Sequence, residues 1–464
     1  MKINKGFHIF VLIFVVYLFY ISNYGGSYLA DSMLSGSIAF VDNQNFIVDD
    51  YVKEGCKTTG CDFAYFKGHF YSGLFPGGTL LAIPLYAIIK PLTNLIPVTG
   101  VGEYPFIQLK ILLLNVFATV FISSLLSALL SVLLYKLLYH FDINHKRRFL
   151  ISLIFSFGTL FFIYSTGYYS RVISAFFVFL SFYLIFTSKV RDNFKPLILS
   201  LAGLSAGFAA ITDFQHFISL GVIFAYLFWV YRNKKLLYFI AGAILPILFF
   251  LGYNFFIFDS FLTTSYHHRA MDVASRINIS IDGGSVDFSF TRMIDYLFSL
   301  KYGLIIYMPF IILSFFGFYL GLRTRFYKET LFCLLLFLSN FLFYSSILWF
   351  SPCSFGLRYL VSVMPFLMVP LIFVFKKIRM IYVVLLGIIS ILFNSLAPMF
   401  YYTCTRGHLF DYYFPTLFQK GLTNYTFNLI STKVIYISPW ITNLISIVFL
   451  SLVFSYGVYI WKKN

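Results

Sequence analysis

The feature of this sequence that most constrains its fold is a series of twelve apolar runs. Eleven of the runs are close to the roughly 20 residues that an α-helix needs to cross a bilayer, and the run 106–135 is longer. Because 60% of the residues are hydrophobic and only 11% are charged, the chain has too few charges for a soluble domain, which needs about 25%. We therefore expect an all-α polytopic membrane protein, with about twelve transmembrane helices in a single transmembrane domain over residues 1–464. The runs are 7–24, 106–135, 149–167, 171–188, 196–212, 216–231, 236–257, 302–321, 330–348, 359–375, 380–398 and 439–460.

The distribution of charge predicts the orientation of these helices. If the N-terminus is cytoplasmic and the runs alternate in direction, the inner segments contain 20 of the 34 Lys and Arg residues but only three of the 17 acidic residues. They then carry the whole net charge of +17, as the positive-inside rule predicts. We expect both termini in the cytoplasm, and no partner among nucleic acids. The inner segments are 1–5, 136–148, 189–195, 232–235, 323–329, 376–379 and 462–464.

The stretch YSGLFPGGTLLAIPLY, residues 71–86, is apolar but contains a Pro-Gly-Gly break and a second proline, Pro84. Counting 78–98 as a span would reverse every later loop and place the basic cluster 146–148 outside. We therefore assign the stretch to a long first extracytoplasmic loop, residues 25–105, with one or two helices lying on the membrane surface. Two further outer segments are expected at 259–301 and 399–438. Cys56 and Cys61 share the first loop, where an oxidising environment permits a disulfide, and their pairing is left open.

Two polar residues stand in apolar settings on the predicted outer side. Asp31 follows the first helix by about one turn, and carboxylates this close to lipid tend to be functional. Arg358, in SPCSFGLRYL, stands where a helix is expected to begin, beside Tyr359. A guanidinium there is placed to bind a phosphate through paired hydrogen bonds, although an interfacial arginine that only reaches toward water is the plain alternative.

Further polar residues gather at outer helix ends. His267, His268 and Arg269 are consecutive and offer donors to a phosphate leaving group, but a solvated loop explains them equally well. Arg171 begins a predicted helix, while Asp213 and His216 stand in a tight outer turn. Short inner loops leave no room for a nucleotide-binding domain, and no phosphate-binding loop sequence is present.

A carboxylate and an arginine at the outer leaflet together suggest transfer of a sugar from a lipid phosphate. The phosphate would lie at headgroup depth, within reach of the arginine. An aspartate would accept the proton of the acceptor hydroxyl as general base. Cationic groups would stabilise the charge that develops on the departing phosphate. One such displacement inverts the anomeric carbon, and we expect that it needs neither a metal nor another cofactor.

A series of motifs on this side resembles the GT-C class of integral-membrane glycosyltransferases, which includes the protein O-mannosyltransferases and the aminoarabinose transferases of lipid A. The resemblance covers most of residues 20–370. It is carried by ADSMLSGSIAFVDNQNFIVDDYVKEG, FKGHFYSGLFPGGTLLAIPLYAI, YSTGYYSRVISAFFVFLSFYLIF, GLSAGFAAITDF, LKYGLIIYMPFII and FSPCSFGLRYLVSVMPFL.

The resemblance implies a polyprenyl- or dolichyl-phosphate-linked donor, a protein, lipid or glycan acceptor, and a first outer loop that covers the active site. It places the base on Asp31, a second acid that positions the acceptor or assists on Asp50, and the donor phosphate near Arg358. Arg171 departs from the pattern, because many relatives have histidine there. The other expected substrate-binding residues are Tyr359, His267, His268, Arg269, Arg171, Tyr71 and Lys67.

A different class of function also fits twelve helices: a transporter, or a flippase for lipid-linked sugars. Such carriers usually contain internal repeats and place charged sites near the middle of the bilayer. In this sequence the two halves do not resemble each other, and the longest loop comes first and outside. We therefore favour the glycosyltransferase. The sugar, the acceptor, the oligomeric state and the dependence on metal are left open by the sequence.

Overall fold

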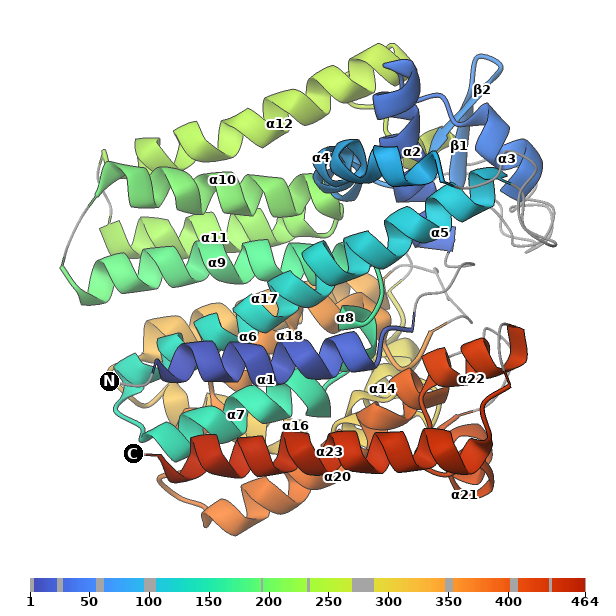
Figure 1. Cartoon of the computed structure of the whole chain (residues 1–464). Coiled ribbons are helices and arrows are strands. Elements are labelled where there is room, and N and C mark those ends of the chain that lie inside the picture. The colour runs from blue at the N-terminus through green and yellow to red at the C-terminus, as the bar shows by residue number, and fades with distance from the viewer. Residues whose placement is uncertain are drawn as a thin grey trace.

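The computed structural model describes residues 4–22, 28–55, 62–95, 106–192, 195–231, 234–268, 288–346, 354–400, 408–433 and 436–463. Within these ranges the chain is a bundle of roughly parallel and antiparallel helices with a small cap at one end (Figure 1). The cap contains a two-stranded antiparallel hairpin, in which Phe63 pairs with Ser72. Its elements are α2 (Tyr28–Asn43), α3 (Asp49–Gly55), β1 (Phe63–Phe66), β2 (His69–Ser72) and α4 (Pro76–Thr93).

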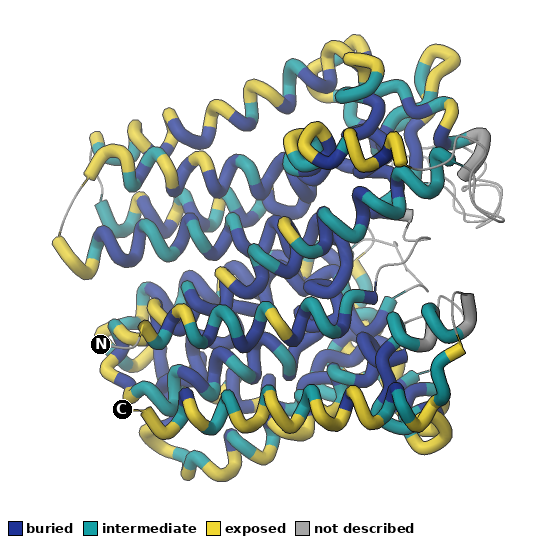
Figure 2. Tube along the Cα trace, in the orientation of Figure 1, coloured by how far each residue is buried: buried dark blue, intermediate teal, exposed yellow. Residues whose placement is uncertain are grey.

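Six helices in the described residues are long and apolar enough to cross a membrane. Each coincides with one of the predicted runs, which confirms a polytopic helical membrane protein; the number twelve stays a prediction. The helix α23 is exposed along most of its length (Figure 2), as a helix that faces lipid would be. The six are residues Phe106–Phe141, α9 (Ser170–Val190), α12 (Leu236–Phe258), α17 (Tyr327–Ser345), α20 (Met380–Phe400) and α23 (Pro439–Lys462).

The remaining runs form shorter helices. Three of them are broken, at Thr159–Leu160, at Pro309 and at Pro370. At the two prolines the cause is that proline lacks an N–H and disfavours the helical conformation of the residue before it. The run 359–375 is therefore three short pieces rather than one helix. The elements are α1 (Lys5–Phe19), α7 (His145–Gly158), α8 (Phe161–Ser165), α10 (Pro196–Thr212), α11 (His216–Tyr231), α15 (Leu304–Tyr307), α16 (Ile311–Gly321), η4 (Arg358–Val363), α18 (Met364–Met368) and α19 (Leu371–Val374). Further short elements are η3 (Ser265–His268), α14 (Phe290–Phe298), η5 (Leu409–Tyr413), α21 (Phe414–Lys420) and α22 (Tyr425–Lys433).

The helix Phe106–Phe141 is longer than a bilayer requires. Its 36 residues span about 54 Å at 1.5 Å per residue, against roughly 30 Å of hydrocarbon. It consists of α5 (Phe106–Ala118), the π-helical turn η1 (Thr119–Ser124), α6 (Leu125–Leu137) and η2 (Leu138–Phe141). The segment α5 extends into the cap and packs against α2, α3 and α4. The predicted run 106–135 therefore includes both a candidate membrane span and a segment, α5, that supports the cap.

One carboxylate joins three helices of the cap. Asp42 on α2 accepts hydrogen bonds from Lys110 on α5 at 2.6 Å and from Tyr86 on α4 at 3.1 Å. Lys90 on α4 lies 2.9 Å away from it. Burial raises the pKa of Asp42, but the hydrogen bonds and charges of the two lysines outweigh burial and hold it below its ordinary value. This network fixes the cap on the N-terminal part of α5.

The residues of the predicted inner segments meet at the opposite end of the bundle. His145 Nε2 lies 2.9 Å from the carbonyl oxygen of Ile460, and Lys146 stands over the ring of Trp461. Arg325 pairs with the carboxylate of Asp142 at 2.7 Å. Both chain termini lie at this end, and the cap lies at the other (Figure 1). The grouping agrees with the charge pattern of the sequence.

The stretch 71–86 forms the end of β2 and the first part of α4. The Pro-Gly-Gly sequence marks the first turn of α4, where proline is favoured because its missing N–H has no partner in the helix. The helix α4 does not reach the hydropathy of a span. The contact of this helix with a membrane surface stays a prediction, as do the bounds of the three outer segments.

Close packing of α10 against α12 depends on two glycines. A methyl group on Gly203 would lie 1.9 Å from the carbonyl oxygen of Phe239, and one on Gly242 would lie 1.9 Å from that of Ser200. We expect Gly203→Ala to force the helices apart and to destabilise the protein by about 1–3 kcal/mol. Thermal unfolding of the purified protein measures this loss. Gly221→Ala is the control, because no atom lies within 4 Å of the added methyl group; an equal effect of both substitutions would contradict the packing explanation.

Candidate active site

A buried ion pair lies where the bundle meets the cap. Arg171 is the second residue of α9, and Asp213 stands in the turn between α10 and α11. The Nε atom of Arg171 is 3.6 Å from Oδ2 of Asp213, and their side chains are only 11% and 4% exposed. Charged groups are seldom buried so far unless they are paired, because desolvation is costly. The pair is therefore a specific feature of the fold.

A second arginine approaches the same place. The guanidinium carbon of Arg171 lies 4.7 Å from the ring centroid of Tyr359, and that of Arg358 lies 5.4 Å from it. The ring of Tyr344 in turn stacks on the ring of Tyr359, and their centroids are 4.6 Å apart. Cations over aromatic faces are stabilised by the ring quadrupole. Arg358, which was predicted to bind phosphate, and Arg171, which was predicted to contact substrate, thus converge on the predicted Tyr359.

Both arginines affect the pKa of the Asp213 carboxyl group. Burial raises the pKa of Asp213 above its ordinary value, and the guanidinium groups of Arg171 and Arg358 offset this effect only in part. We regard the carboxyl group as ionised, because its neutral form would remove the counter-charge that lies 3.6 Å from the buried guanidinium of Arg171. The cluster of these three side chains then carries a net charge of about +1.

The turn that holds Asp213 is fixed by its neighbours. Gln215 donates a hydrogen bond to Ser362 Oγ in η4 at 2.7 Å, which ties the turn to the element that carries Arg358. A methyl group on Gly77, at the start of α4, would lie 2.7 Å from the Cα atom of Thr212. The beginning of α4 is thus pressed against the end of α10. Only the absence of a side chain on Gly77 permits this approach.

The same part of α4 brings Asp31 to this end of the bundle. Asp31 is half-buried in the first turn of α2. Met33, two residues further along α2, packs against Gly78 of α4. A methyl group added to Gly78 would lie 2.4 Å from the sulfur atom of Met33. The hydroxyl of Tyr168, just before α9, donates to the Gly78 carbonyl at 2.6 Å. A continuous set of contacts therefore links the helix of Asp31 with the elements of Arg171 and Asp213.

The two adjacent acids of VDDY differ in their surroundings. Asp49 accepts a hydrogen bond from the backbone N–H of Phe70 at 2.6 Å and lies 2.8 Å from His69 Nδ1. It fastens β2 to α3. Asp50, the residue predicted to assist catalysis, is exposed in the first turn of α3. The sequence does not distinguish these neighbours, and the structure gives Asp49 the structural role.

Four other predicted substrate contacts lie around the hairpin. Tyr71, on β2, packs at an angle against Phe258 at the end of α12, and burial raises the pKa of its hydroxyl. Lys67, in the exposed hairpin turn, pairs with Asp259, which follows α12. His268 stacks on Phe258 with ring centroids 5.0 Å apart. Burial and the adjacent His267 lower the pKa of His268.

These hairpin residues form a group apart from the two arginines. His267 accepts a hydrogen bond from the backbone N–H of Thr264 at 3.2 Å, within its own turn. Tyr266, next to His267 in the chain, is close enough to Arg171 to act on its charge, and its ring packs against Phe75 and Phe214 at centroid distances of 5.4 and 5.3 Å. Arg269, Cys56 and Cys61 lie outside the described residues.

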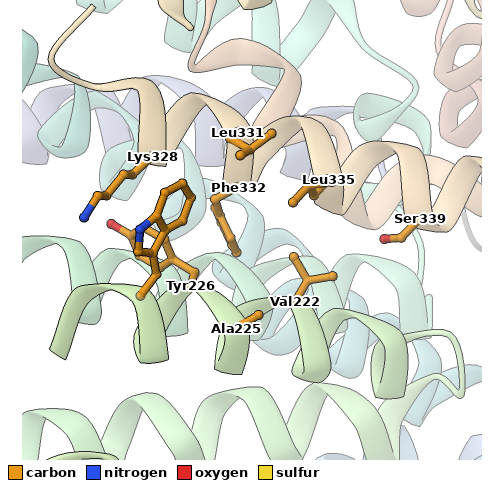
Figure 3. A pocket seen from close by; sticks show the side chains of 9 residues that line it. Val222, Ala225, Tyr226, Lys328, Leu331, Phe332, Leu335 and Ser339 are labelled. Carbon is orange, nitrogen blue, oxygen red and sulfur yellow. The ribbon is translucent and has the colours of Figure 1, made fainter. Parts of the chain in front are cut away.

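Two cavities lie away from this site, toward the end of the chain termini. One, of about 200 Å³, runs between α11 and α17, with Lys328 and Ser339 at opposite ends of its row of lining residues (Figure 3). The other, of about 320 Å³, includes Asp142 and Arg325. None of the predicted site residues lines either cavity. Among the described residues, no group of three or more His, Cys, Asp or Glu side chains is arranged to hold a metal ion.

The sequence prediction missed two residues of the cluster. Asp213 was recognised only as a polar turn residue, and Tyr344 lies inside an apolar run, where nothing in the sequence distinguishes it from other aromatic residues. The sequence did contain a signal that Asp213 belongs to a buried charged cluster. An aspartate between two apolar helices, bounded by Thr212 and Phe214, has few routes to solvent and requires a buried cation as partner.

The fold is similar to that of a solved protein structure. The chain is similar to ArnT from Cupriavidus metallidurans, a GT-C glycosyltransferase, in its apo state, with a TM-score of 0.50 and 12% identity over 97% of this chain and 73% of that one. It is similar to the same protein bound to undecaprenyl phosphate, with a TM-score of 0.50 and 11% identity over 98% of this chain and 74% of that one. No protein-family model and no curated protein matches the chain. The predicted resemblance to the GT-C class is confirmed at the level of the fold.

Proposed function

We propose that this protein transfers a sugar from a polyprenyl- or dolichyl-phosphate-linked donor to an acceptor on the extracytoplasmic side of the membrane. The observation that carries the proposal is the convergence of Arg171 and Arg358 on Tyr359 at the junction of bundle and cap. Guanidinium groups match phosphate oxygens in geometry and charge. The similarity to a structure that binds undecaprenyl phosphate supports a polyprenyl phosphate as the lipid part of the donor.

In the proposed reaction, the acceptor hydroxyl oxygen attacks the anomeric carbon and forms the new glycosidic bond. The bond from that carbon to the phosphate oxygen breaks, and its electron pair leaves with the polyprenyl phosphate. Asp31 accepts the hydroxyl proton as general base. Arg171 and Arg358 stabilise the charge that grows on the phosphate. A single displacement from the opposite face inverts the anomeric configuration.

The cap is the part we assign to the extracytoplasmic side. This assignment is supported by the charge distribution, because the basic segments gather at the end that contains both termini, and the cap lies at the other (Figure 1). We propose that the cap covers the site and that Asp50 contacts the acceptor from its exposed position on α3. Lys67, Tyr71, His267 and His268 would contact substrate from the hairpin side.

Arg358→Ala tests the donor site. Removing a charged donor of hydrogen bonds to phosphate costs about 1.5–3 kcal/mol, so we expect the KM for the lipid-linked donor to rise about 10–100-fold. The assay uses protein reconstituted in liposomes, a panel of polyprenyl-phosphate-linked sugars, and release of polyprenyl phosphate as readout. Arg325→Ala is the matched control, since Arg325 is exposed at the opposite end and pairs with Asp142.

The same vesicles distinguish the proposed enzyme from a carrier. Counterflow of a labelled lipid-linked sugar without formation of polyprenyl phosphate would contradict the proposal and favour a transporter or flippase. Equal KM values for Arg358→Ala and the wild-type protein would remove Arg358 from the donor site.

A further inference from the structure

The cavity of about 200 Å³ between α11 and α17 is a groove that opens onto the apolar surface of the bundle, away from the candidate active site (Figure 3). Among its lining residues Tyr226 and Phe332 are buried, whereas Ala225 and Leu335 are exposed. Because α17 is a candidate membrane span, this opening faces lipid. The volume is below the roughly 300 Å³ of typical small-molecule pockets, so the groove suits a chain that lies only partly within the protein.

The hydroxyl groups that line this groove are already engaged within the protein. The hydroxyl of Ser339 donates a hydrogen bond to the carbonyl oxygen of Leu336 in its own helix at 3.2 Å. The hydroxyl of Tyr226 donates to the buried carboxylate of Glu329 at 2.9 Å, and Lys189 pairs with the same carboxylate at 2.6 Å. Along most of its length the groove therefore offers a ligand apolar contacts, which favours a hydrocarbon chain.

The end of the groove nearest the chain termini is cationic. The Nζ atom of Lys328 lies 5.1 Å from the ring centroid of Trp229, and no carboxylate among the residues that the structure describes pairs with this lysine. Lys234 and Arg323 are exposed at the same end. Tryptophan and lysine are the residues that lie at headgroup level, and basic pockets between transmembrane helices bind anionic lipid headgroups. Charge therefore favours a lipid with an anionic head.

The length of the groove matches one leaflet of a bilayer. Lys328 and Ser339 are eleven residues apart on α17, which is about 16 Å at ~1.5 Å per residue. One leaflet contributes half of the roughly 30 Å of hydrocarbon. We propose that the groove binds one anionic phospholipid of the leaflet at the end of the chain termini, with its phosphate at Lys328 and Trp229 and one acyl chain lying toward Ser339. This site is separate from the proposed sugar transfer and does not depend on it.

Quenching of the fluorescence of Trp229 by brominated lipids tests the headgroup contact. The full chain is reconstituted in phosphatidylcholine vesicles that contain either brominated phosphatidylglycerol or brominated phosphatidylcholine at the same fraction. We expect phosphatidylglycerol to be preferred about fivefold, the usual effect of one cation near the membrane surface. Lys328→Gln should reduce the preference below about twofold, and Lys328→Arg should keep it. Lys136→Gln is the control, because Lys136 is exposed on α6 and does not line the groove. Trp229 is made the single tryptophan by the substitutions Trp349→Phe, Trp440→Phe and Trp461→Phe.

A second variant tests the acyl chain. Ala225→Phe narrows the groove and leaves its charge unchanged. We expect it to weaken binding of brominated phosphatidylglycerol about tenfold, which corresponds to the loss of about two buried methylene groups. Ala241→Phe is the matched control, because Ala241 is exposed on α12 and does not line the groove.

Three outcomes would overturn the inference. Equal quenching of Trp229 by the two brominated lipids would mean that the groove holds bulk lipid without selection. A preference that persists in Lys328→Gln would remove Lys328 from the site. Complete displacement of brominated phosphatidylglycerol by an equimolar amount of undecaprenyl phosphate would mean that the groove holds a polyprenyl chain instead. Thermal unfolding shows whether each variant is folded, and Ala225→Phe decides the matter if Lys328→Gln is not. Selective binding in a protein that transfers no sugar would contradict only the proposed function.

Discussion

Replacing Asp31 with asparagine is expected to lower the rate of sugar transfer by about 10²–10⁴-fold, the usual contribution of a general base. Asparagine has nearly the same shape as aspartate but cannot accept the proton of the acceptor hydroxyl. Affinity for undecaprenyl phosphate should change less than threefold, because the two arginines proposed to bind the phosphate are intact. Single-turnover transfer from a lipid-linked donor in liposomes measures the first quantity, and equilibrium binding measures the second.

The position of Asp31 makes this test specific. The residue is half-buried in the first turn of α2, while Asp50, the other predicted acid, is exposed on α3. Asp142→Asn is the matched control for removal of one carboxylate, since its side chain is 75% exposed near the chain termini. Transfer within threefold of the wild-type rate in Asp31→Asn would exclude this residue as the base and would direct the search to Asp50.

The membrane class of the fold is predictable from the sequence because the bilayer sets a simple requirement of length and hydropathy. The run at residues 236–257 and the helix α12 (Leu236–Phe258) agree almost residue for residue. The requirement does not say where an apolar run bends or continues. Pro309 and Pro370 interrupt two runs, and the helix Phe106–Phe141 continues past the bilayer into the cap. Length and hydropathy alone therefore predict neither the breaks within a run nor the continuation of a helix beyond it.

The candidate site is predictable in part, and for a related reason. Arg358 was recognised because a cation in an apolar setting is costly wherever the chain folds, and Arg171 because it begins a predicted helix where the resembling class has histidine. Their convergence on Tyr359 depends on the crossing of α9 and η4, which no local pattern encodes. The pairing of Arg171 with Asp213 depends on the same packing. Asp49 and Asp50 show the limit most plainly, because these adjacent identical residues have different surroundings once β2 lies against one of them: Asp49 is hydrogen-bonded to β2, and Asp50 is exposed.

Replacing Arg171 with methionine is expected to destabilise the protein by about 3 kcal/mol, because it leaves the Asp213 carboxylate buried with less compensation. The loss should fall at the lower end of the usual 3–5 kcal/mol range for a broken buried pair, since Arg358 still acts on the same carboxylate. Thermal or denaturant unfolding of the purified protein measures it. The substitution also removes half of the proposed phosphate site, so transfer should be lost.

A double variant separates these two effects. Arg171→Met combined with Asp213→Leu removes both charges and fills the space with apolar atoms, and replacement of a buried pair in this way is often neutral or stabilising. We expect the double variant to recover most of the stability that Arg171→Met loses, and to transfer sugar no better than the single variant. Stability and activity then respond to different features of the pair: stability to the balance of buried charge, and activity to the presence of the guanidinium. Additive destabilisation in the double variant would contradict this view, because it would mean that the two side chains do not interact.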